Sequence, residues 1–193
     1  MKTSAISLLL RIFLVSAVLS LAAPSAFAAP KVFLSFFDKA DGESVVKGKE
    51  KWVELDSLGF GIEAETSWTK GGGASVGKPN PGKLIIEKYL DTASNVIYGY
   101  ICTGKAFPKV EIQVHKTTDA PAPETYLTFT LEGVFVTSVQ NKVGTEGIAR
   151  ETLSFVYKTI KMEYKPQDPK SGKLGAPKIF NWDVPAGTAS PSN

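Results

Sequence analysis

The sequence contains one cysteine and one histidine in 193 residues, which limits the chemistry that the chain can perform. Cys102 cannot form an intrachain disulfide, so stability must come from packing and from subunit contacts. His115 has no second histidine or carboxylate at metal-ligand spacing, and no G-x-S-x-G motif supplies a serine for it to activate. The sequence therefore predicts no catalytic residue, no metal site and no cofactor, and a secreted enzyme is only a minor alternative.

The chain also has little excess of either charge, with 22 Lys and Arg against 19 Asp and Glu. Both signs are interspersed, so the composition lacks the basic surface typical of proteins that bind nucleic acid or anionic membranes. We therefore predict no nucleic-acid partner.

One long apolar run is present, from Ile6 to Ala23, and Ala26-Phe27-Ala28 follows it as a small-x-small cleavage signal. This plan predicts a signal peptide over residues 1–28, cut between Ala28 and Ala29. The alternative is an uncleaved membrane anchor, but Pro24 and the cleavage signal favour removal. The mature chain is then periplasmic or extracellular, with no stable membrane insertion. Its formal charge falls from +3 to +1, because residues 1–28 contain two basic residues and no acidic one.

After the predicted signal peptide, short segments alternate between apolar and polar residues, which is typical of antiparallel strands. The predicted strands cover residues 31–37, 51–62, 83–89, 110–115, 125–139, 150–164 and 178–184. One helix is predicted from Asp91 or Thr92 to about Cys102, where apolar residues recur at helical spacing and Gly104 provides a stop. The predicted fold is mainly β, either an antiparallel barrel or two packed sheets, with one α-helix at the side. This domain covers residues 29–184, and residues 185–193 are predicted to be a disordered tail.

The predicted strand 150–164 changes the parity of its apolar residues, from Leu153, Phe155 and Tyr157 to Ile160, Met162 and Tyr164. Such a change indicates a bulge or a strand that is buried on both faces. Phe36 and Phe37, as neighbours in a strand, would likewise point to opposite sides. A second apolar face must be covered by a partner or by the helix.

Residues 68–82 are rich in glycine and proline and are predicted to form a loop. Gly72-x4-Gly77-Lys78 nearly matches a phosphate-binding P-loop. That motif requires Ser or Thr after the lysine and a helix that begins there, whereas Pro79 occupies the position here. The match is therefore interpreted as accidental.

Several motifs occur together in a fixed order. They are GES at 42–44, WVELDSLGFGI at 52–62, GGG at 71–73, CTGKAFPKVEIQV at 102–114, SF-x-Y-x6-Y-x-PQ at 154–167, GKLG at 172–175 and WD at 182–183. In this order and spacing they resemble the haemolysin-coregulated protein family, Hcp, the tube subunits of type VI secretion. The resemblance covers nearly all of the chain after about residue 31.

The resemblance implies two sheets that form a barrel with a helix at its side. It also implies six-membered rings that stack into a tube and can hold small effector proteins, so the expected partners are further copies of this chain and secreted effectors or tip proteins. The family's extended loop contacts neighbouring subunits. It corresponds here to a predicted contact loop that includes Trp68, Lys70, Gly71, Gly72, Gly73 and Lys78.

The predicted signal peptide departs from this family, whose tube subunits assemble in the cytoplasm and carry none. Two functions therefore remain open. The first is an exported, non-catalytic, ring-forming subunit related to the secretion tube. The second is a stand-alone exported binding module that keeps the fold and forms no tube.

Overall fold

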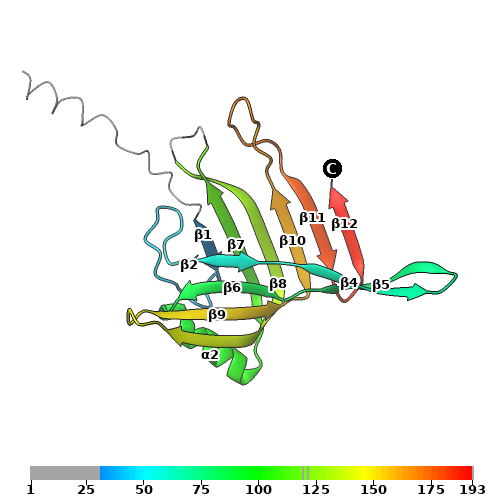
Figure 1. Cartoon of the computed structure of the whole chain (residues 1–193). Coiled ribbons are helices and arrows are strands. Elements are labelled where there is room, and N and C mark those ends of the chain that lie inside the picture. Colours follow the sequence, from blue (N-terminus) through cyan, green and yellow to red (C-terminus); the bar gives the residue numbers. More distant parts are fainter. Residues whose placement is uncertain (1–30, 119, 121, 193) are drawn as a thin grey trace, which may run out of the picture.

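The computed structural model describes residues 31–118, 120 and 122–192, so the predicted signal peptide and its cleavage site lie outside the described part. Within that part the chain forms strands and one helix, in an order that Figure 1 shows. Their bounds are β1 (Val32–Ser35), β2 (Val53–Leu55), β3 (Ser57–Gly59), β4 (Ile62–Thr69), β5 (Gly73–Pro81), β6 (Leu84–Tyr89), α2 (Thr92–Thr103), β7 (Phe107–Lys116), β8 (Glu124–Val143), β9 (Ala149–Val156), β10 (Thr159–Tyr164), β11 (Lys178–Asp183) and β12 (Thr188–Ser192).

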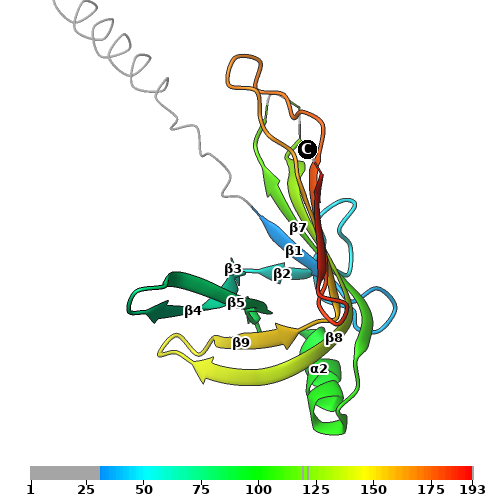
Figure 2. The same cartoon turned by 90° about the vertical axis from the view of Figure 1, so that its right-hand side faces the viewer.

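Two antiparallel sheets share the long strand β8. Sheet A has the order β12-β11-β10-β8-β7-β1-β2, and sheet B has the order β3-β6-β9-β8. The chain bends at Gly133, where φ is +59°, and β8 passes there from one sheet into the other. Strand β2 ends sheet A and pairs with β1, and β3 ends sheet B and pairs with β6, so the described residues form two sheets packed at an angle rather than one closed barrel (Figure 2). The mainly β fold is confirmed, in its two-sheet form.

The core lies between the two sheets and against α2. Alternation places every second side chain of β6 and β7 in this core, because successive residues of a strand face opposite sides. Fully buried members include Leu34, Leu84, Ile86, Ile97, Phe107, Ile112, Leu131, Val134, Leu153 and Phe155.

The predicted helix is confirmed. Asp91 is its N-cap, and its carboxylate accepts the N–H of Ala93, while Ser94 completes a capping box. Gly104 ends the helix with φ +62°, a left-handed conformation that glycine adopts without steric cost.

The prediction of one strand over residues 150–164 is wrong. Strand β9 ends at Val156 in sheet B and β10 begins at Thr159 in sheet A, so the chain changes sheets at Tyr157 and Lys158. The N–H of Lys158 donates to the carbonyl of Glu132 at 2.9 Å, which holds this crossing beside the bend of β8. Leu153 and Phe155 of β9 and Ile160 of β10 therefore face one core from two sheets, whereas Tyr164 at the end of β10 is exposed.

Phe36 and Phe37 point to opposite sides as predicted, but the prediction that both lie in a strand is wrong. Strand β1 ends at Ser35, and Phe37 lies in the following turn with φ +57°. Phe36 is buried and Phe37 is 42% exposed, so they do lie on opposite sides, but through a turn rather than through strand alternation.

The C-terminal segment differs from its predicted disorder, because residues 188–192 form β12 and pair with β11. Pro191 lacks an N–H but is tolerated here, since β12 is the outermost strand of sheet A. Strands β11 and β12 are neighbours in the sequence, and the turn that joins them contains Gly187, whose φ is +66°.

Candidate functional site

The predicted contact loop is a β-hairpin rather than an irregular loop. Strands β4 and β5 pair only with each other, with Trp68 opposite Ala74 and Thr66 opposite Val76. Glycines 71 and 73 have φ +91° and +83°, values that only glycine adopts easily, and they allow the tight connection at 70–72. The structure therefore gathers five of the six predicted contact residues at the hairpin tip, while Lys78 lies farther along β5.

The hairpin projects beyond the strands of sheet A, as Figure 1 shows. One of its faces carries Trp68, which is 82% exposed, and Val76, which is 69% exposed. On the other face the hydroxyls of Ser67 and Ser75 lie 2.5 Å apart. An exposed tryptophan beside an exposed valine forms an apolar surface, and in soluble proteins such surfaces mark contacts with other molecules.

The P-loop-like motif lies within this hairpin. Gly77, Lys78 and Pro79 belong to β5, and β6 follows it after two residues. A phosphate-binding loop needs a helix N-terminus at this point to present its N–H groups. The interpretation of the motif as accidental is therefore supported by the structure.

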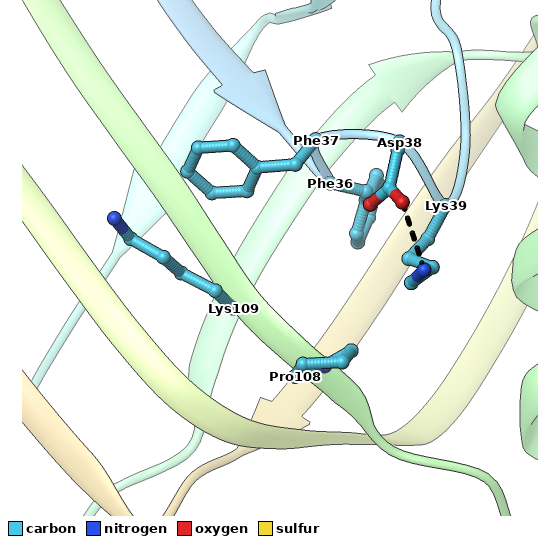
Figure 3. Close-up of a pocket in the computed structure, with 6 residues that line it drawn as sticks. All are labelled: Phe36, Phe37, Asp38, Lys39, Pro108 and Lys109. Atoms are coloured by element: carbon cyan, nitrogen blue, oxygen red, sulfur yellow. Dashed lines mark hydrogen bonds and ion pairs between the residues drawn. The ribbon is translucent and has the colours of Figure 1, made fainter.

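A shallow hollow lies near the end of β1, lined by Phe36, Phe37, Asp38, Lys39, Pro108 and Lys109 (Figure 3). Its charged groups already have partners, because Lys39 donates to Asp38 at 2.9 Å and the ammonium of Lys109 lies 4.8 Å from the Phe37 ring centroid. Since these side chains do not converge on a common point, the hollow does not have the geometry of an active site.

The sequence analysis missed a buried ionic cluster under α2. Lys88 is fully buried, and its ammonium lies 2.7 Å from Asp91 Oδ1 and 2.8 Å from Glu151 Oε2. It also donates to Ser94 Oγ at 2.9 Å and to the Tyr89 carbonyl at 2.9 Å. Three elements, β6, α2 and β9, therefore meet at one lysine. The signal was present in β6, where Lys88 falls on the same parity as Leu84 and Ile86.

Glu151 is 1% exposed, and its carboxylate is held by several donors. Burial alone would raise the pKa of this carboxyl, but hydrogen bonds from Lys88, Ser94 and Tyr98 outweigh that effect and hold the pKa below its ordinary value. Lys88, Ser94 and Glu151 are buried and Tyr98 is half-buried, so the cluster docks the helix onto sheet B.

The depressed pKa of Glu151 makes stability depend on pH. The folded state binds a proton at this carboxyl less readily than the unfolded chain, so the stabilisation is complete above the ordinary value of 4.5 and is lost as pH falls through the folded-state pKa. We expect the free energy of unfolding to decrease below about pH 4.5. Urea titrations at several pH values measure this, and Glu151→Gln should reduce the slope in that range. The exposed Glu146→Gln is the control, and an equal reduction there would contradict the assignment.

The sole histidine is half-buried rather than on the surface. Its ring centroid lies 5.0 Å from that of Phe33, and its Nε2 lies 3.0 Å from the Thr125 hydroxyl. Burial lowers the pKa of His115, and the nearby Lys49 ammonium lowers it further. Cys102 is exposed. In the described part of the chain, no three His, Cys, Asp or Glu side chains are grouped as a metal site would require.

Across residues 31–118, 120 and 122–192, no helix combines the length and the apolar character that crossing a membrane requires.

Comparisons with known proteins agree with this geometry. A protein-family model described as "Type VI secretion system effector, Hcp" matches residues 33–164. Protein hcp1 of Pseudomonas aeruginosa is 27% identical over 108 residues, which cover 55% of this chain and 66% of that protein, slightly less than two thirds of its length.

Solved structures give the same result. One described as a type six secretion system protein has a TM-score of 0.74 and 28% identity, and covers 86% of this chain and 100% of its own. Hcp1 from Salmonella typhimurium has a TM-score of 0.66 and 25% identity, and covers 84% of this chain and 100% of its own. The family match spans more than half of the sequence and both sheets, and the chain therefore belongs to the Hcp family of type VI secretion proteins.

Proposed function

We propose that this chain is an exported structural subunit that assembles with copies of itself into a ring related to the type VI secretion tube and performs no catalysis. The hairpin of β4 and β5 carries the proposal. It pairs with no other strand of the described chain and presents Trp68 at 82% exposure. A neighbouring copy would cover this apolar face, and the family resemblance implies a ring of six. Effector or tip proteins are the further partners that the family implies.

The hairpin, and not the change of apolar parity in residues 150–164, is the structural feature that supports a subunit contact. The side chains of β9 and β10 face one core from two sheets, so they give no support for a subunit contact. The hairpin, in contrast, holds a defined shape through seven cross-strand registers while contributing no residue to the buried core cluster. An exposed apolar face with a defined strand register is suited to binding a neighbouring copy, because the contact removes this apolar surface from water.

Replacing the apolar face should abolish assembly while leaving the fold intact. In the chain that begins at Ala29, Trp68→Ser combined with Val76→Thr is expected to shift the mass from a multimer to a monomer, as measured by light scattering. The matched control is Glu63→Gln with Glu65→Gln, which changes exposed charged residues of the same hairpin that are not among the predicted contact residues. Circular dichroism should be unchanged in both. A wild-type monomer at high micromolar concentration would overturn the ring.

A second candidate is a stand-alone exported binding module with the Hcp fold. The predicted signal peptide favours it, because the subunits of the secretion tube assemble in the cytoplasm, as the resemblance implies. Genes for a sheath and a baseplate beside this gene would favour the ring, and their absence would favour the binding module.

Release of the exported chain from the membrane requires that the signal peptide is removed. We expect the exported protein to begin at Ala29, because the small-x-small signal ends at Ala28. N-terminal sequencing of the protein recovered from the periplasm or medium measures this directly. Recovery of the intact N-terminus in the membrane fraction would instead indicate an anchor.

A further inference from the structure

One end of sheet A carries a concentration of lysines that the small net charge conceals. We call it the lysine end and define it by Lys116, Lys165, Lys170, Lys173 and Lys178. Lys116 ends β7, Lys165 follows β10 and Lys178 begins β11. These positions lie at the same end of the strands of sheet A. Lys170 and Lys173 lie in the connection between β10 and β11, which extends beyond the strands beside the connection between β7 and β8 (Figure 1).

None of these five lysines has an ion-pair partner within 4.0 Å among the described residues. Elsewhere, Lys39, Lys51 and Lys88 each pair with a carboxylate. Glu124, which is opposite Lys116 in the ladder, accepts a hydrogen bond from the Thr118 hydroxyl at 2.5 Å instead. Glu124 and Asp168 also lie at this end but form no ion pair with these lysines, so its positive charge is not neutralised by ion pairs within the described chain.

The connection that carries Lys170 and Lys173 has a defined shape. The N–H groups of Lys170 and Ser171 donate to the Asp168 carboxylate at 2.9 and 2.6 Å. Backbone hydrogen bonds also join Asp168 to Lys173 and Pro166 to Gly175. These donors lower the pKa of Asp168, so its carboxylate stays charged and engaged with the backbone rather than with a lysine.

Two tyrosines lie within the lysine end. Tyr126 and Tyr164 pack edge to face with their ring centroids 6.3 Å apart, and Tyr164 is 41% exposed. The ammonium of Lys116 lies over the Tyr126 ring, 4.5 Å from its centroid. Tyrosine and lysine together suit the boundary between water and lipid, where an aromatic body and a charged head can each find their preferred surroundings.

We propose that the lysine end is a docking surface for an anionic phospholipid bilayer, which the protein contacts peripherally through lipid phosphates. A protruding end can approach a flat surface with the exposed side chains of Lys170, Lys173 and Lys178, whereas a nucleic-acid strand requires a groove and free aromatic faces for its bases. The face of Tyr126 is already occupied by Lys116, so it offers no such platform. Contact through head groups needs no membrane-spanning segment and is compatible with a water-soluble subunit.

Vesicle binding tests this surface. The buried core lies within residues 31–192, so the chain that begins at Ala29 is the form to use. We expect it to sediment at low salt with vesicles of phosphatidylcholine mixed with phosphatidylglycerol, and not with phosphatidylcholine alone. Raising the salt to about 1 M shortens the screening length to about 3 Å and should release it.

The decisive variant is Lys170→Gln with Lys173→Gln and Lys178→Gln. Each lysine near an anionic surface increases partitioning about fivefold, so the triple variant should bind about 100-fold more weakly. The control removes the same charge from exposed lysines of other segments, through Lys83→Gln, Lys105→Gln and Lys142→Gln, and should bind almost as the wild type does.

Three outcomes would overturn the proposal. They are no wild-type binding to phosphatidylglycerol vesicles, equal losses in the two triple variants, or binding to a single-stranded oligonucleotide without binding to vesicles. Light scattering of each variant separates this result from ring assembly, because the hairpin is unchanged in all of them.

Discussion

Replacing Lys88 by methionine is expected to lower the free energy of unfolding by about 3–5 kcal/mol, because it leaves buried carboxylates without their cation. The Lys88 side chain is fully buried. Its ammonium lies 2.7 Å from Asp91 Oδ1 and 2.8 Å from Glu151 Oε2. In the variant, Glu151 would keep donors from Ser94 and Tyr98 but would lose its only ion-pair partner among the described residues. Urea denaturation, followed by circular dichroism, measures the loss.

A double variant distinguishes a missing charge partner from lost packing. Lys88→Met with Glu151→Gln removes both charges, so it should be more stable than Lys88→Met alone. The exposed Lys142→Met is the control for the substitution itself and should change the free energy of unfolding by less than about 0.5 kcal/mol. If the double variant were less stable than the single one by the full cost of Glu151→Gln, the two side chains would not be coupled.

Trp182→Ala is expected to lower the free energy of unfolding by about 3–5 kcal/mol, because it leaves a cavity that the surrounding strands cannot fill. Trp182 is 5% exposed and lies in β11, opposite Ile160, which is itself buried. The prediction that Trp182 packs into the core is confirmed, although it fills the space between two sheets rather than closing a barrel.

The neighbouring Asn181 provides a matched control, since it lies on the same strand and is exposed. Asn181→Ala should leave the denaturant midpoint nearly unchanged, whereas Trp182→Phe should cost less than Trp182→Ala because it keeps most of the apolar volume. An unchanged midpoint for Trp182→Ala would show that β11 is not docked in solution.

Local patterns predicted the elements whose signals lie within a few residues. Helix α2 followed from its apolar spacing and from Gly104, and β7 followed from the alternation of Val110, Ile112 and Val114. Gly133 indicated the bend in β8 because a glycine inside an apolar strand favours unusual backbone angles. The segment that carries the proposed contact residues was recognised as a connection from its glycines, and glycines 71 and 73 lie at the hairpin turn, whereas its contact role came from the family resemblance and stays a prediction.

Features that depend on distant residues could not be predicted in this way. The change of parity after Tyr157 is the same for a bulge as for a chain that changes sheets, and only the pairing with β6 and β8 decides between them. Lys88 and Glu151 are 63 positions apart, so no local pattern joins them. Strand β12 has the composition of a tail and becomes ordered through its ladder with β11. The lysine end depends in part on the fold, because sheet A brings Lys116 of β7 to the same end as residues 165–178, which carry the other four lysines.

Strand β8 has a consequence for cooperativity. It is 20 residues long and is hydrogen-bonded in sheet A to β7 and β10 and in sheet B to β9. Neither sheet can separate from the other without breaking a ladder of this strand, so the two sheets should open together in one transition rather than as two independent units. The β4–β5 hairpin, which shares no ladder with β8, is free of this coupling. Its amide protons should therefore exchange with solvent long before those of the sheets, and their protection on assembly would report subunit contact residue by residue.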